Sequence, residues 1–117
     1  MNVAVKIALG AALSLVVTTP AVARTVAVLP GGQCIVADVT PKTVTGTISI
    51  PFGLAFDVAP TVVVTAMWRF SDTPVGGVET IKSVSVDQFV DLSNNADPGN
   101  YFVSWIAIGP ASKQACI

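Results

Sequence analysis

The sequence predicts an all-β domain, because of its composition and the spacing of its turn residues. From Arg24 onward, Val, Ile and Thr supply 31 of 94 residues, whereas Leu, Met, Glu, Lys and Arg supply only 10. Branched side chains favour a pleated sheet, and residues that stabilise a helix are scarce here. Turn-forming residues recur at short intervals, at Pro30-Gly31-Gly32, Pro41, Pro51, Pro60, Pro74 to Gly77 and Asp97-Pro98-Gly99.

Residues 43–50 and 61–70 alternate in character, which is the period of a strand with two different faces. In the first segment the expected inward residues are Val44, Ile48 and Ile50. In the second they are Val62, Val64, Ala66, Trp68 and Phe70. Both segments are therefore expected to form strands.

Two weaker strand signals follow. In residues 78–86, Ile81 is out of phase with Val84 and Val86, and a β-bulge would explain the shift. Residues 88–93 are long enough for one short strand.

The segment from residue 101 to residue 108 is apolar on both faces. Tyr101, Val103, Trp105 and Ala107 alternate with Phe102, Ile106 and Ile108. In a two-layer sandwich only one face of a strand meets the opposite sheet, so the second face needs another covering. A partner subunit is the economical covering, with Tyr101, Phe102, Val103 and Trp105 as the expected interface. The alternative is that the chain's own residues 25–39 cover this face.

The first 23 residues have the parts of a secretory signal peptide. Lys6 supplies positive charge, residues 7–17 form an apolar stretch, and Ala21-Val22-Ala23 fits a cleavage site before Arg24. The alternative is a membrane anchor, but the apolar stretch is shorter than the ~20 residues that cross a bilayer. We therefore expect a single domain over residues 24–117, secreted or periplasmic, with no membrane attachment after cleavage.

The two cysteines, Cys34 and Cys116, lie near opposite ends of this domain. In an exported protein this arrangement favours a single disulfide, and two buried free thiols are the alternative. Two cysteines without histidine are too few ligands for a zinc site.

Composition also limits the function. The net charge of −1 offers no basic surplus for nucleic acid, and the absence of histidine removes the commonest general base. Asp87 and Asp91 form the only acid/base option, and a solvated strand edge explains them better. We expect no enzyme activity, no metal and no cofactor.

Several stretches between Gly46 and Gly109 carry a family resemblance. They are Gly46 to Phe52, Phe56, Pro60 to Thr65, Phe89 and the closing Tyr101 to Gly109, which reads Tyr-Phe-Val-Ser-Trp-Ile-Ala-Ile-Gly. Here the chain resembles the H-type lectin domain of snail agglutinins and of the discoidin C-terminus. The resemblance implies a six-stranded antiparallel β-sandwich that forms a homotrimer and binds galactose or N-acetylgalactosamine between subunits. A related closing strand occurs at the tips of phage tail fibres.

The family's Trp-His pair and its arginine have no counterparts in this chain, so candidate sugar contacts come from polar residues near the loop 94–100. Amide and carboxylate groups can bind vicinal sugar hydroxyls, and an aromatic ring can stack on a sugar face. The candidates in and beside this loop are Asn94, Asn95, Asp97, Asn100 and Tyr101. Arg69 and Asp72, at the end of the segment 61–70, could cap a groove or merely pair with each other on the surface. A plain hairpin loop is the simpler interpretation. Calcium bound by Asn95, Asp97 and Asn100 is a weaker alternative, because only one carboxylate is present.

Together these observations predict a secreted carbohydrate-binding protein. The main alternative is a non-catalytic structural or adhesive trimerisation module that contacts protein. An inhibitor of extracellular enzymes is a third hypothesis, since small rigid β domains also serve that role.

Overall fold

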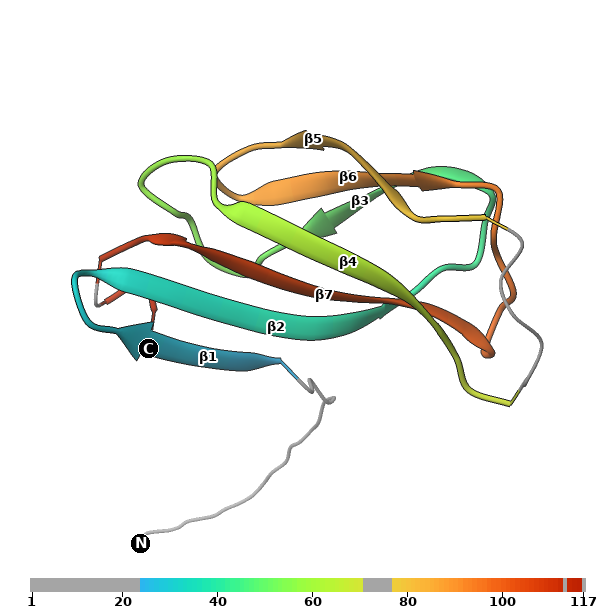
Figure 1. Ribbon diagram of the computed structural model, residues 1–117, viewed down its shortest axis with the longest axis horizontal. Helices are drawn as coiled ribbons and strands as arrows, with labels where there is room; N and C mark the ends of the chain where they lie inside the picture. The colour runs from blue at the N-terminus through green and yellow to red at the C-terminus, as the bar shows by residue number, and fades with distance from the viewer. Residues whose placement is uncertain (1–23, 71–76, 113, 117) are drawn as a thin grey trace, which may run out of the picture.

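The regular structure of this protein consists of β-strands throughout the residues that the computed structural model describes, which are 24–70, 77–112 and 114–116. The strands are β1 (Thr25–Leu29), β2 (Gln33–Pro41), β3 (Gly46–Pro51), β4 (Thr61–Trp68), β5 (Thr80–Val84), β6 (Gln88–Ser93) and β7 (Tyr101–Pro110). They form two antiparallel sheets, β1-β2-β7-β4 and β3-β6-β5 (Figure 1). The all-β prediction is confirmed, but the structure has seven strands rather than six.

The additional strand comes from the N-terminal segment. Gly31 and Gly32 have φ angles of 83° and 80°, and this left-handed backbone allows the chain to reverse between β1 and β2. β2 then pairs with β7 along its whole length, from Gln33 opposite Pro110 to Pro41 opposite Phe102. Residues 25–39 therefore extend the sheet beside β7 and do not cover its outer face, contrary to the alternative considered above.

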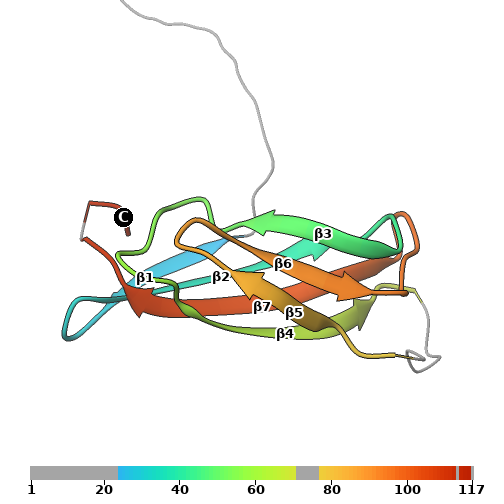
Figure 2. The same ribbon diagram turned by 90° about the horizontal axis from the view of Figure 1, so that it is seen from above.

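The two sheets lie face to face (Figure 2). An aromatic core lies between them. Trp105 of β7 contributes from the larger sheet, and its ring centroid lies 5.5 Å from Phe89 and 5.8 Å from Phe52. Phe56 packs edge-on against Phe52 at 5.2 Å. Burial of these rings supplies much of the hydrophobic driving force for the fold.

The alternating pattern predicts the wrong burial for residues that lie just outside the strands. Phe70 was expected inside, but it follows the end of β4 and is 79% exposed. Val44 likewise precedes β3 and points to solvent. In β5 the register shifts between Ile81 and Ser83, so the predicted irregularity is confirmed.

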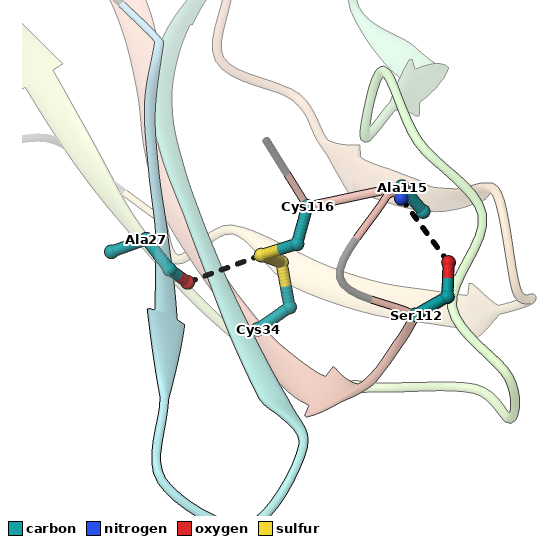
Figure 3. The surroundings of a disulfide bond; sticks show 5 residues. All are labelled: Ala27, Cys34, Ser112, Ala115 and Cys116. Carbon is teal, nitrogen blue, oxygen red and sulfur yellow. Dashed lines mark hydrogen bonds between the residues drawn. A yellow bond between two sulfur atoms is a disulfide. The ribbon is translucent and has the colours of Figure 1, made fainter.

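The disulfide joins Cys34 of β2 to Cys116, beyond β7, with 6.0 Å between the Cα atoms (Figure 3). The predicted pairing is therefore confirmed. The Sγ atom of Cys116 also lies 3.2 Å from the carbonyl oxygen of Ala27 in β1. The bond thus fastens the segment after β7 to the β1–β2 side of the larger sheet.

Two sequence expectations fall on other parts of the chain. The expected signal peptide, residues 1–23, lies outside the described residues, and so does Asp72. In the described ranges no helix has the length and apolarity needed to cross a bilayer.

Candidate functional site

A polar region forms at the end of the molecule where β6 ends and β7 begins, on the right of Figure 1. It contains a hollow of about 380 Å³, lined by Gly77, Val78, Thr80, Leu92, Ser93, Asn94 and Asn95. A second hollow, of about 190 Å³, is lined by Val64, Thr65, Ala66, Gly77, Val78 and Glu79. Gly77 and Val78 therefore border both hollows, and Glu79 borders the smaller one.

Glu79 links the elements around these hollows. Its Oε2 atom accepts hydrogen bonds from Ser93 Oγ at 2.7 Å, from Asn95 Nδ2 at 3.2 Å and from the hydroxyl of Tyr101. Burial alone would raise the pKa of Glu79. Hydrogen bonds, the strongest from Asp91 and the others from Tyr101, Ser93 and Asn95, outweigh burial and hold this pKa below its ordinary value.

Asp91 is the second carboxyl group of the region, and it is fully buried. β6 is the central strand of its sheet, and the alternation of side chains places Asp91 on the same inward side as Phe89 and Ser93. Burial, together with the hydrogen bond and the charge of Glu79, raises the pKa of Asp91 to about 7. The expectation of a solvated edge is therefore wrong for Asp91, although Asp87 is exposed.

Lys42 supplies a buried positive charge just after β2. Its Nζ atom donates to the carbonyl oxygens of Val44 at 2.9 Å, Gly46 at 3.1 Å and Ser93 at 3.2 Å. Its charge partly opposes the rise in the pKa of Asp91. One side chain thus connects the chain around the start of β3 to the end of β6.

Asp97 and Asn100 use their side chains within the loop. Asn100 Nδ2 donates to Asp97 Oδ2 at 3.1 Å, and Asn100 Oδ1 accepts from the backbone nitrogen of Phe70 at 2.8 Å. The carbonyl oxygen of Asp97 also accepts from the backbone nitrogens of Asn100 and Tyr101. These contacts are those of a structural turn, so a plain hairpin loop is the interpretation that fits residues 97–100.

The other candidate sugar contacts differ in their burial and in the residues around them. Asn94 is exposed and lines the larger hollow, where half-buried Asn95 also lies. Tyr101 is fully buried, with its ring centroid 5.0 Å from that of Trp68, so it cannot stack on a sugar from this position. The guanidinium carbon of Arg69 lies 5.1 Å from the ring centroid of Phe102.

The expected interface residues of β7 divide between its two faces. Tyr101, Val103 and Trp105 are buried on the inner face, within the chain itself. Phe102 alternates with them and faces outward beneath Arg69. The uncovered part of β7 is thus its outer face, where Ile106 is 42% exposed.

Lys42 and Glu79 were not identified from the sequence as site residues. Two features of the sequence could have drawn attention to the carboxyl groups. Glu79 is the only glutamate of the chain, and Asp91 alternates with apolar Phe89. In the part of the chain that the structure describes, no three His, Cys, Asp or Glu side chains come together to hold a metal ion.

Comparisons of the chain with family models, with curated proteins and with solved structures found no match.

Proposed function

We propose that this protein is a secreted, non-catalytic carbohydrate-binding protein that binds glycans in the larger hollow. The observation that carries the proposal is an open depression of about 380 Å³ whose lining includes Thr80, Ser93, Asn94 and Asn95. Hydroxyl and amide groups can exchange hydrogen bonds with sugar hydroxyls. The H-type lectin resemblance supports a galactose or N-acetylgalactosamine ligand and a homotrimer.

The second candidate is a structural or adhesive trimerisation module that contacts protein. It is favoured by the outward face of the larger sheet, where Val63, Met67 and Ile106 are all exposed. These residues lie on β4 and β7, which pair directly, with Val63 opposite Ile106. Adjacent apolar side chains of this kind are typical of a surface that another subunit covers.

A glycan array that includes glycans with terminal galactose and with terminal N-acetylgalactosamine tests the first candidate. Asn94→Ala should weaken binding about five- to tenfold, since one hydrogen bond contributes roughly 1 kcal/mol. Thr47→Ala, at an exposed position of β3, is the matched control and should bind as the wild type does. If the wild type binds no glycan on the array, the carbohydrate proposal is refuted.

Light scattering on the same preparations tests the second candidate. Ile106→Lys places a charge on the apolar face and should dissociate the oligomer, whereas Thr47→Lys should leave it intact. A wild-type protein that is monomeric at all concentrations would refute the trimer.

A further inference from the structure

The free edge of β4 lacks the features that keep the other sheet edges of this protein from pairing with another chain. β4 borders the larger sheet, and within the described residues no strand pairs with its outer side (Figure 2). Exposed edges are usually protected by shortness, by lysine or proline, or by a β-bulge. β1 has five residues, β3 ends in Pro51, and β5 carries exposed Lys82 beside a register shift. β4 has eight residues, with neither charge, proline nor register shift.

Hydrogen bonds near the start of β7 show which backbone groups of β4 point away from the sheet. Arg69 N donates to Asn100 O at 2.8 Å, so these residues form a hydrogen-bonded pair at the end of the β4–β7 ladder. On the opposite side of β7, Lys42 N donates to Tyr101 O at 3.0 Å, so the backbone of Tyr101 points toward β2. Bonded and non-bonded pairs alternate along an antiparallel ladder. The N–H and C=O groups on the free edge are therefore those of Val62, Val64, Ala66 and Trp68.

The middle of this edge is open. Val64, Thr65 and Ala66 line the smaller hollow, of about 190 Å³, together with residues 77–79. The outward backbone groups of Val64 and Ala66 thus lie beside a space that a partner strand can enter.

We propose that the free edge of β4 pairs antiparallel with β4 of a second copy of this chain, about a two-fold axis through Thr65. The two larger sheets then become one continuous sheet. Extended strands commonly bind in this way to an exposed sheet edge, where main-chain hydrogen bonds supply the affinity. Here Val64 and the partner's Ala66 exchange backbone N–H and C=O hydrogen bonds on each side of the axis.

A second copy fits this edge because β4 is complementary to itself. Residues opposite each other must lie on the same face of the sheet. With the axis at Thr65, exposed Val63 lies opposite the partner's Met67, and Thr65 lies opposite the partner's Thr65. Apolar pairs and threonine pairs are both favourable across strands. An axis at Val64 would instead place Val63 against threonine.

This pairing is independent of glycan binding and of the trimer assigned to the outer face of the larger sheet. It uses the backbone edge of β4, whereas the central residue of that outer face, Ile106, lies on β7. A two-fold contact gives a dimer by itself, and it gives an assembly of even copy number if the outer face also associates.

Cysteine cross-linking tests the register. Thr65→Cys places two cysteines at a non-hydrogen-bonded pair, where the Cα atoms lie about 4.5 Å apart, within the range of a disulfide. Val63→Cys is the matched control, because it is exposed on the same face of the same strand. Its two cysteines would lie about 13 Å apart along the strands, too far to be joined.

Both variants are oxidised in air, and mass spectrometry confirms that the Cys34–Cys116 disulfide is intact. Non-reducing electrophoresis should then show at least ~tenfold more linked dimer for Thr65→Cys than for Val63→Cys. Adding Ile106→Lys to Thr65→Cys should leave the cross-link in place, which separates this contact from the outer-face trimer.

Ala66→Pro, added to Thr65→Cys, removes an edge N–H group that the β4–β7 ladder does not use, and proline is tolerated on edge strands. The cross-link should be lost while near-ultraviolet circular dichroism shows a folded domain. Wild-type protein should sediment as a dimer or as a multiple of a dimer. Equal linking of the two cysteine variants, linking that persists in folded Ala66→Pro, or a wild type that is only monomeric or trimeric would overturn the proposal. If Ala66→Pro fails to fold, the cysteine pair and the sedimentation decide.

Discussion

Replacing Lys42 with methionine should destabilise the domain, because one buried ammonium group binds three backbone carbonyl oxygens. Methionine retains most of the aliphatic stem but has no donor for the carbonyl oxygens of Val44, Gly46 and Ser93. The contact with Ser93 is buried, whereas the other two lie partly in reach of water. The loss should therefore fall mainly on the connection to the end of β6.

The three contacts do not contribute equally to the expected loss. A hydrogen bond from a charged donor contributes roughly 1.5–3 kcal/mol, and this range applies in full to the buried contact. The two partly exposed carbonyls recover hydrogen bonds to water, and removing a buried charge also relieves part of its desolvation cost. We expect a net loss of about 2–4 kcal/mol in the free energy of unfolding.

Urea unfolding followed by tryptophan fluorescence, with the disulfide intact, measures this loss. Lys82→Met is the matched control, because Lys82 is exposed on β5, and its effect should stay within about 0.5 kcal/mol. Lys42 also lowers the pKa of Asp91, so Lys42→Met should move any pH dependence of stability toward higher pH. A loss below about 1 kcal/mol, or one equal to that of Lys82→Met, would refute the structural role assigned to Lys42.

Two further predictions concern stability. Because the pKa of Asp91 is raised to about 7, the native state binds this proton more tightly than the unfolded state does. The resulting stabilisation is complete below the ordinary pKa of an aspartate. That stability is lost as the pH rises to about 7, by up to about 1.4 kcal/mol per pH unit; urea unfolding from pH 4.5 to 8 checks it, and a flat profile would contradict it. Removing the disulfide with Cys34→Ser and Cys116→Ser should cost up to about 4.5 kcal/mol for a loop of 82 residues. Calorimetric melting of the variant beside the oxidised protein checks this, and equal melting temperatures would show that the cross-link does not stabilise the fold.

The strands were predictable where a local pattern determines them. β6 coincides with residues 88–93, and β7 begins at Tyr101 as expected and continues to Pro110. The two-residue period of β4 correctly separated half-buried Val62 from exposed Val63. The pattern failed at Phe70, because alternation of side chains carries no signal for where a strand ends.

The polar core was not predictable in the same way. Lys42 and Asp91 are fully buried and Glu79 is half-buried, whereas residues of these types are rarely fully buried unless they are paired. Their partners lie far along the sequence, as when Glu79 accepts from Tyr101, and only the order of strands in the sheets brings them together. The local sequence pattern therefore predicts a solvated edge for Asp91 and an accessible loop for Tyr101, whereas both residues are buried.

The position of β7 in the larger sheet has a consequence for the order of folding. β1, β2 and β4 are all synthesised before β7, yet both β2 and β4 pair with it directly. β4 has no partner in its sheet until β7 arrives, so the sheet cannot assemble progressively as the chain emerges. Contacts over such sequence separations also slow folding, because the loops between them must close first. The domain is thus built to complete its fold after synthesis of β7, and its earlier apolar strands must be kept from aggregating until then.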